Sequence, residues 1–256
     1  MTRSFYAFQA IMTREFSRFI RQRTRLLSAL VRPLFWLLVF AAGFKSTLGI
    51  ATQAPYSTYT TYDVYIIPGL IGMVCLFNGM QSSLAMAFDR EAGSMKVLMT
   101  APISRRKLLV FKLLAAATVS TIQAYLMLAI ALLFDVHLPL IGLLIAVPVV
   151  FLIAYALALI GLLLASTVNG MENFAGVMNF VIFPALFLSS SLYPLWQLQE
   201  SSELLYWISV LNPFTHLVES VRFAIYSQFD LMPLLGIVMG VILLSYIVPL
   251  VYKPNA

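Results

Sequence analysis

The stretch from Phe88 to Lys112, FDREAGSMKVLMTAPISRRKLLVFK, is a charged island between two long apolar segments. Asp89 and Glu91 stand where acidic residues favour the start of a helix. Three apolar residues follow at the i, i+3, i+4 spacing of one helix face: Met95, Leu98 and Met99. This pattern predicts a short amphipathic helix over 89–100, and Pro102 ends it because the residue before a proline disfavours helical geometry. The alternative is a solvated loop whose basic residues only fix the orientation of the chain in a membrane.

The composition is that of a membrane protein. The 256 residues are 61% hydrophobic and 10% charged, with a mean hydropathy of +0.94, whereas soluble domains carry roughly 25% charged residues. The length allows about six spans of about 20 residues each. The net charge of +6 does not imply nucleic acid here, because basic residues orient membrane proteins. We therefore expect an all-α membrane protein with six transmembrane helices.

The expected elements follow from the apolar runs, and together they form one transmembrane domain over 1–256. Residues 1–25 form a basic amphipathic helix with a phenylalanine stripe, which is typical of a helix lying in the membrane interface. The six spans are expected at 26–44, 64–87, 108–134, 138–165, 174–192 and 231–251. Between the last two, residues 193–228 are too interrupted to span, and we expect two short outer re-entrant helices at about 195–210 and 214–226.

Small residues predict where helices pack closely. Ala154, Ala158, Gly161 and Ala165 recur at spacings of three and four, which lets helix backbones approach one another. Gly236 and Gly240 form a GxxxG pair, which predicts packing of the last span against a neighbouring helix.

Lys and Arg residues predict the orientation. With both ends of the chain inside, the cytoplasmic side holds seven basic residues in 3–32, six in 90–112 and Lys253, against Lys45 and Arg222 outside. Cytoplasmic loops carry the excess of Lys and Arg. The 89–100 helix is therefore expected in the cytoplasm and the 193–228 segment outside.

Familiar enzyme motifs are absent from the sequence. There is no HExxH, CxxC or GxSxG pattern and no Walker A sequence, and the single cysteine, Cys75, lies in an apolar run. For His137 and His216 we favour interface roles over catalysis or metal binding. We expect no catalytic residue, cofactor or metal in this chain, so any energy for its activity would come from elsewhere or the protein would be passive.

Two motifs resemble those of type-2 ABC exporter permeases, the family that includes drug, Nod-factor and polysaccharide exporters. DREAGSMKVLMTAPISRRKLL (89–109) is similar to the family's E-x-G-T pattern followed by hydrophobic residues and T-P. LSSSLYPLWQLQ…LNPFTHLVESVR (188–222) is similar to its broken segment before the last span. The sequence departs at 94–96, where Ser-Met-Lys replaces Thr, an aliphatic residue and Glu, which puts charge matching to an ATPase in doubt.

The resemblance implies a function. Two permeases would pair, a homodimer being expected, and each would engage a separate ABC ATPase subunit that binds ATP and Mg. The 89–100 helix would be the coupling helix that docks on the ATPase. Its coupling residues would be Glu91, Gly93, Ser94, Met95, Lys96, Leu98, Met99, Thr100 and Pro102.

The resemblance also suggests a path and a location. Cargo would pass at the dimer interface, with its wall formed by Asn78, Gln81, Asn179, Phe180, Phe183 and Phe187; packing of these phenylalanines against lipid or helices is the alternative. The absence of a large soluble recognition domain favours an amphiphilic cargo, such as a drug, a lipid-like metabolite or a glycolipid. Membrane lipid and no nucleic acid would be contacted, and the bacterial inner membrane is the expected location.

Three other interpretations remain open from the sequence. A passive channel or ion-coupled carrier would need no ATPase partner. A membrane-embedded transferase would need acidic and metal-binding groups that the sequence lacks. A regulatory or resistance module would keep the ABC assembly without transporting cargo.

Overall fold

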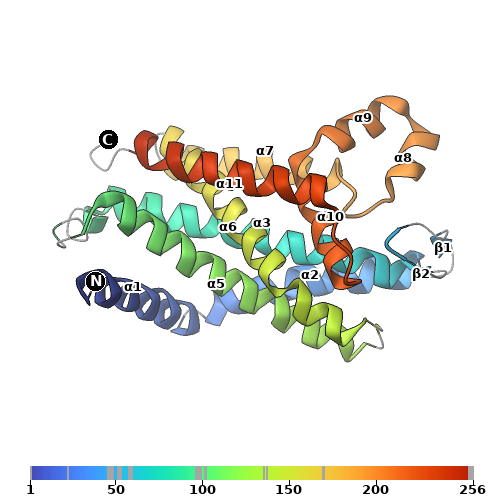
Figure 1. The fold of residues 1–256 in the computed structure, drawn as a ribbon, viewed down its shortest axis with the longest axis horizontal. Helices are drawn as coiled ribbons and strands as arrows, with labels where there is room; N and C mark the ends of the chain where they lie inside the picture. Colours follow the sequence, from blue (N-terminus) through green and yellow to red (C-terminus); the bar gives the residue numbers. More distant parts are fainter. Residues whose placement is uncertain are drawn as a thin grey trace.

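A computed structural model describes residues 2–21, 23–44, 49–50, 54–56, 60–95, 100, 103–134, 136, 138–168 and 171–252. This part of the chain is almost all helical (Figure 1). The helices are α1 (Thr2–Arg21), α2 (Arg23–Phe44), α3 (Tyr62–Glu91), α5 (Arg105–Leu132), α6 (Leu140–Thr167), α7 (Met171–Phe187), α8 (Leu195–Ser201), α9 (Glu203–Leu211), α10 (Pro213–Ile225) and α11 (Leu231–Val251). Two short strands, β1 (Gly49–Ile50) and β2 (Thr60–Thr61), pair in antiparallel fashion before α3.

Four of the described helices, α3, α5, α6 and α11, are long and apolar enough to cross a membrane. The expected first and fifth spans coincide with α2 and α7, which contain shorter apolar segments, Leu30–Val39 and Asn173–Phe187. The chain is therefore an integral membrane protein with four candidate spans. The expected fifth span, 174–192, extends past the end of α7, because residues after Phe187 leave the helix in a buried turn.

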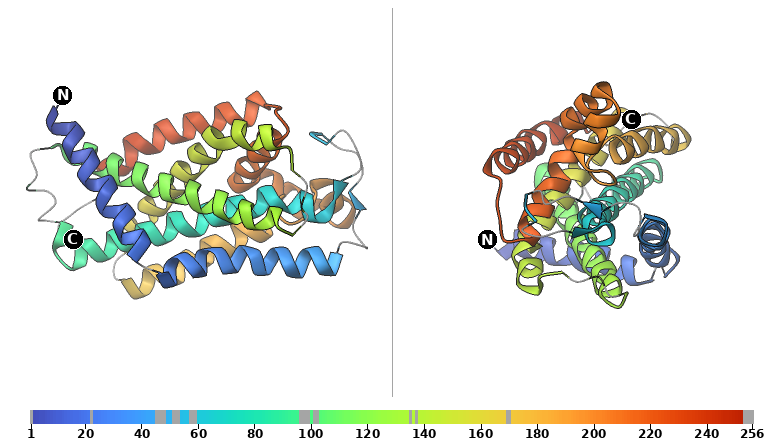
Figure 2. Two further views of the ribbon diagram at one scale, coloured as in Figure 1. Left: turned by 90° about the horizontal axis from the view of Figure 1, so that it is seen from below. Right: turned by 90° about the vertical axis from the view of Figure 1, so that its right-hand side faces the viewer.

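The long helices run in alternating directions along the bundle (Figures 1 and 2). The start of α1, the end of α3, the start of α5 and the end of α11 lie at the same end. Contacts support this placement, since the Arg105 guanidinium lies 5.7 Å from the Tyr252 ring and that of Arg106 lies 5.5 Å from the Tyr246 ring. We call this the basic end of the bundle. The opposite end holds the strands and the short helices α8 and α9.

Helix α3 is the centre of the core, and its closest neighbour is α6. A Cβ added to Gly79 of α3 would lie 2.9 Å from the Leu157 backbone, and one added to Gly161 of α6 would lie 2.6 Å from Ser83 Oγ. Ala154, Ala158 and Ala165 are also buried. The small-residue row thus sets the close approach predicted from the sequence.

The second glycine pair has no neighbouring helix within the described residues, so packing against a second copy stays a prediction. A Cβ added to Gly236 or Gly240 of α11 would meet no atom within 4 Å, so none of the described helices packs against this pair. Only 17% of the apolar window of α11 is buried within the chain. A lone GxxxG therefore did not mark a contact inside this chain.

The prediction of two helices after α7 also needs correction, because three form. Ser202 adopts an extended conformation (φ −165°, ψ 119°), which separates α8 from α9. Helix α10 begins at Pro213, where the Asn212 side chain accepts a hydrogen bond from the Phe214 N–H, a standard N-cap. Nine of its residues are buried, so α10 packs within the bundle against α3 and α6.

Helix α1 lies across the basic end of the bundle and packs against α5 and α2. Ile11 and Phe19 are buried, and the Phe8 ring meets Phe111 of α5 at 5.3 Å between centroids. The phenylalanine stripe predicted for this helix therefore faces two environments, since Phe5 and Phe16 are exposed. An exposed aromatic face on a helix beside a membrane protein's basic end is compatible with an interfacial position.

Candidate functional site

Asp89, in the last turn of α3, is a carboxylate with only 5% of its surface exposed. Lys112 of α5 is equally buried, and its Nζ lies 2.9 Å from Asp89 Oδ2. A buried charge is tolerated when it is paired and hydrogen-bonded, and this pair meets both conditions. The ion pair therefore joins the end of α3 to the first part of α5.

Two arginines of α1 complete what we call the Asp89 cluster. Arg14 Nη2 lies 3.8 Å from Asp89 Oδ2, and Arg18 Nη1 lies 3.8 Å from Oδ1. These longer contacts are partly solvated and are weaker individually than the buried pair. Their effect is to tie α1 to the same carboxylate, so one acid links three helices.

The chain then turns at Gly93, whose φ of +72° lies in the left-handed region. Glycine adopts this conformation without steric cost, which explains the glycine of the EAG sequence. Ser94 Oγ donates to the Asp89 carbonyl oxygen at 3.1 Å, which holds the turn against the cluster. The Met95 side chain is fully buried in the core.

The predicted coupling residues therefore occupy different environments. Glu91 and Thr100 are exposed, Gly93 and Ser94 are half-buried, and Met95 is inside the chain. Lys96, Leu98, Met99 and Pro102 lie outside the described residues. The sequence analysis placed Asp89 and Glu91 at the start of a helix over 89–100, and this start is wrong because both residues lie in the last turn of α3, which ends at Glu91. It also missed the cluster, although two arginines at i and i+4 in α1 were the available sign of an acidic partner.

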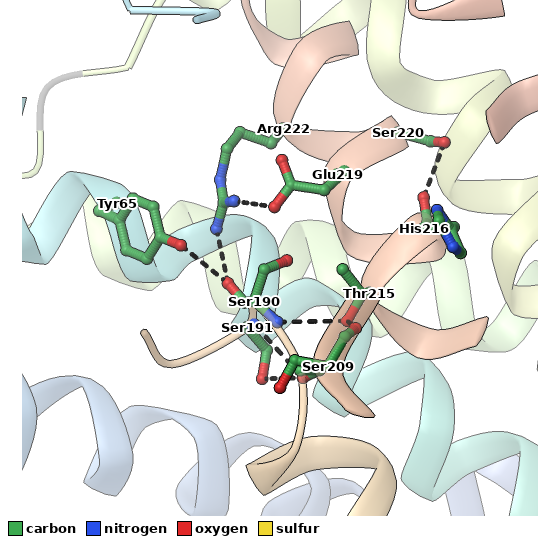
Figure 3. Close-up of polar contacts among 10 residues, drawn as sticks. Tyr65, Ser190, Ser191, Ser209, Thr215, His216, Glu219, Ser220 and Arg222 are labelled. Atoms are coloured by element: carbon green, nitrogen blue, oxygen red, sulfur yellow. Dashed lines mark hydrogen bonds and ion pairs between the residues drawn. The ribbon is translucent and has the colours of Figure 1, made fainter. Parts of the chain in front are cut away.

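A second polar cluster surrounds Arg222 of α10, which is 3% exposed (Figure 3). The guanidinium pairs with Glu219 through Nη1, and Nη2 donates to the Ser190 carbonyl oxygen at 3.0 Å. Its Cζ lies 4.0 Å from the centre of the Tyr65 ring, a cation–π contact. Burial alone would lower the pKa of Arg222, but the Glu219 carboxylate holds it above the usual value.

The Arg222 cluster holds together the broken segment after α7. Tyr65 OH also donates to the Ser190 carbonyl oxygen at 3.0 Å, and Tyr62 OH donates to that of Leu192 at 2.7 Å. These donors satisfy backbone groups that would otherwise be buried without partners. Sequence reasoning counted Arg222 as an outer-loop charge, although Glu219 three residues earlier on the same helix face indicated a paired role.

The predicted path residues fall into two groups. Asn78 is buried and lies with Glu15 and Ser120 around a small cavity of about 20 Å³, and Gln81 is half-buried. The members on α7 are all exposed: Asn179, Phe180, Phe183 and Phe187.

The α7 group continues onto α2. The Phe183 and Phe187 rings stack at 6.1 Å, and Phe187 meets Trp36 of α2 at 5.8 Å. Leu27, Val31, Phe35, Leu38 and Val39 of α2 are also exposed. Together, α2 and α7 present a broad apolar face without a partner in the described chain.

Among the described residues, no group of three or more His, Cys, Asp or Glu side chains could hold a metal ion. The features on which a function can be built are therefore the paired charges, the broken segment and the apolar helix faces.

A bundle of apolar helices with ion pairs at both ends defines a polytopic membrane protein. Residues 6–226 match the ABC-2 type transporter family, and the chain therefore belongs to that family of membrane permeases. It is 28% identical over 227 residues to transport permease ycf38 of Porphyra purpurea, covering 87% of this chain and 74% of the relative. It is 29% identical over 169 residues to multidrug ABC transporter permease YbhR of Escherichia coli K12, covering 65% of this chain and 45% of the relative.

Proposed function

We propose that the chain is the membrane subunit of an ATP-driven exporter, coupled to a separate ATPase subunit that binds ATP and Mg. The six apolar helices α2, α3, α5, α6, α7 and α11 would all cross the membrane, with both chain ends in the cytoplasm. The excess of Lys and Arg at the basic end supports this orientation. A bacterial inner membrane is the proposed location, and two copies would form the transporter.

The Asp89 cluster is the observation that carries the proposal. One buried carboxylate links α1, α3 and α5 next to the segment expected to dock on the ATPase. A displacement of that segment would move three helices together, because separating Lys112 from Asp89 would leave the buried Lys112 ammonium unpaired. This is a mechanical connection between the cytoplasmic surface and the spans.

The docking surface is proposed to extend from Glu91 to Thr100. Both residues are exposed, and Gly93 allows the turn that separates the docking segment from α3. Leu98 and Met99 would supply the apolar contact with the ATPase. Met95 would instead anchor the segment to this chain, because its side chain is buried here.

Cargo is proposed to pass along the α2–α7 face, between two copies of the chain. This face is apolar and exposed, as a membrane dimer interface or an amphiphile path requires. The proposed cargo is amphiphilic, since the exposed side chains of the path are mainly aromatic. Asn179 would supply the polar contact.

The test is co-purification from native membranes of the full chain. We expect a soluble ATPase to accompany the chain, and we expect Leu98→Asp to remove it by placing a charge in the apolar contact. Phe229→Asp is the matched control, because Phe229 is exposed and lies two residues before the start of α11, far along the chain from the docking segment. If no ATPase accompanies the unaltered chain, a passive channel or carrier replaces this proposal.

A further inference from the structure

Two cavities meet on the side of the bundle formed by α6, α10 and α11. The first is an apolar groove of about 580 Å³, and the second is a polar pocket of about 340 Å³. His216 of α10 and Pro233 of α11 line both, so the two cavities adjoin. An apolar groove joined to a polar pocket is complementary to an amphiphile, because the groove suits its apolar chain and the pocket its polar headgroup.

Two glycines of α11 create space in the apolar groove. Gly236 and Gly240 leave two positions of its α11 wall without a side chain, and an added Cβ at either position would meet open space. Ala156 and Ile160 of α6 form the opposite wall, and Leu244 lies at the inner end. From Met232 to Leu244, the groove follows α11 for about 18 Å, close to the depth of one leaflet of a bilayer whose hydrocarbon core is about 30 Å thick.

The polar pocket carries an unbalanced negative charge. Arg222 and Glu219 line it but neutralise one another. The Asp230 carboxylate caps α11 through the Met232 N–H and forms no ion pair with a described residue. Tyr56 and Phe223 add aromatic surface. Carboxylate and aromatic groups together favour a cationic group, and they disfavour an anion.

We propose that this composite cavity binds a membrane phospholipid whose headgroup carries an ammonium group. One acyl chain would fill the groove beside Gly236 and Gly240, and the ammonium would lie against Asp230. Asp230 stands at the first turn of an apolar helix, which is the level of lipid headgroups in a bilayer. The lipid would supply the packing that α11 lacks. This site is separate from the α2–α7 face proposed for cargo and does not depend on ATPase coupling.

The experiment uses the full chain in nanodiscs without ATP. The probes are phosphatidylethanolamine and phosphatidylglycerol, each with a photoreactive group at the end of one acyl chain. We expect phosphatidylethanolamine to label peptides around Leu244 and Ile160 about threefold more than phosphatidylglycerol does. A preference of this size is what one partly exposed contact between opposite charges provides.

The variants test separately the contributions of the groove and of the Asp230 carboxylate to lipid binding. Gly236→Leu with Gly240→Leu should abolish labelling without a clash, because both sites face open space. Met239→Leu is the control, since that side chain is 70% exposed and does not line the groove. Asp230→Asn keeps the helix cap but should remove the preference between headgroups.

Three results would overturn the inference. One is equal labelling by the two lipids in the unaltered chain, and another is unchanged labelling in the double glycine variant. The third is efficient disulfide formation between copies carrying Gly240→Cys, which would show that a second copy of the chain covers the groove.

Discussion

At the scale of single residues, Arg222 shows why one charge can stay inside a membrane protein. Its three kinds of contact, with Glu219, the Ser190 carbonyl and the Tyr65 ring, replace the water that burial removes. The same side chain fixes the broken segment after α7, because its donor reaches that backbone.

This arrangement predicts an asymmetry between single and double variants. Arg222→Leu alone should lower the free energy of unfolding by about 3 kcal/mol, because the Glu219 carboxylate loses its partner. Arg222→Leu combined with Glu219→Leu should cost clearly less, since no unpaired charge remains. Thermal unfolding of the purified chain in detergent measures both. Equal losses in the single and double variants would contradict the paired-charge explanation.

At the scale of elements, glycines decide how closely helices pack. Gly79 lies against the α6 backbone. A Cβ added to Gly176 of α7, in contrast, would have no atom within 4 Å. The same substitution should therefore have opposite effects at the two positions.

We expect Gly79→Ala to destabilise the chain by about 1–3 kcal/mol, because the new methyl group overlaps the Leu157 backbone. Gly176→Ala should be neutral or stabilising by up to about 1 kcal/mol, since alanine favours the helix. Unfolding midpoints of the two variants measure the difference. Similar midpoints would mean that the α3–α6 contact does not limit packing.

The Asp89 cluster acts between elements, and Asp89→Asn tests it. The amide keeps the shape but leaves Lys112 buried without a counter-charge, so we expect a loss of about 3 kcal/mol in stability. Because Arg14 and Arg18 lose the same partner, α1 should be held less firmly by its remaining apolar contacts and trypsin should cut near Arg21 faster. Glu200→Gln, at an exposed position, is the control and should change stability by less than about 0.5 kcal/mol. Unchanged trypsin cleavage in Asp89→Asn would show that the cluster does not hold α1.

Composition and periodicity predicted the helical membrane fold, because apolar runs and the small-residue row of α6 are local in sequence. The break at Ser202 was not predicted, since a single extended residue leaves no periodic signal. The GxxxG pair faces open space within this chain, because spacing shows which residues share a face and the fold decides whether that face has a neighbour in the same chain. The Asp89 cluster joins Asp89 to residues at least 23 positions away, and the Arg222 guanidinium reaches the Ser190 carbonyl oxygen 32 positions away, which local patterns do not reveal.

At the scale of the whole molecule, we propose different roles for the basic end and for the apolar faces. The basic end gathers the Asp89 cluster and the proposed docking segment, and the exposed α2–α7 face is the surface proposed for a second copy and for cargo. The groove beside α11 lies elsewhere and is proposed to hold lipid. This division is what a permease driven by a separate ATPase requires, since force enters at one end and acts on the spans.

The most direct test of that central claim is hydrogen exchange of the complex purified from native membranes, compared with ATP and with ADP. On this proposal, an ATP-dependent change within this chain is transmitted to it from the ATPase partner. We predict altered exchange in the peptide covering 89–100 and in α1 and α5, with Asp89→Asn confining the change to 89–100. Identical exchange with ATP and ADP in every peptide of this chain would contradict the proposal that ATP drives it.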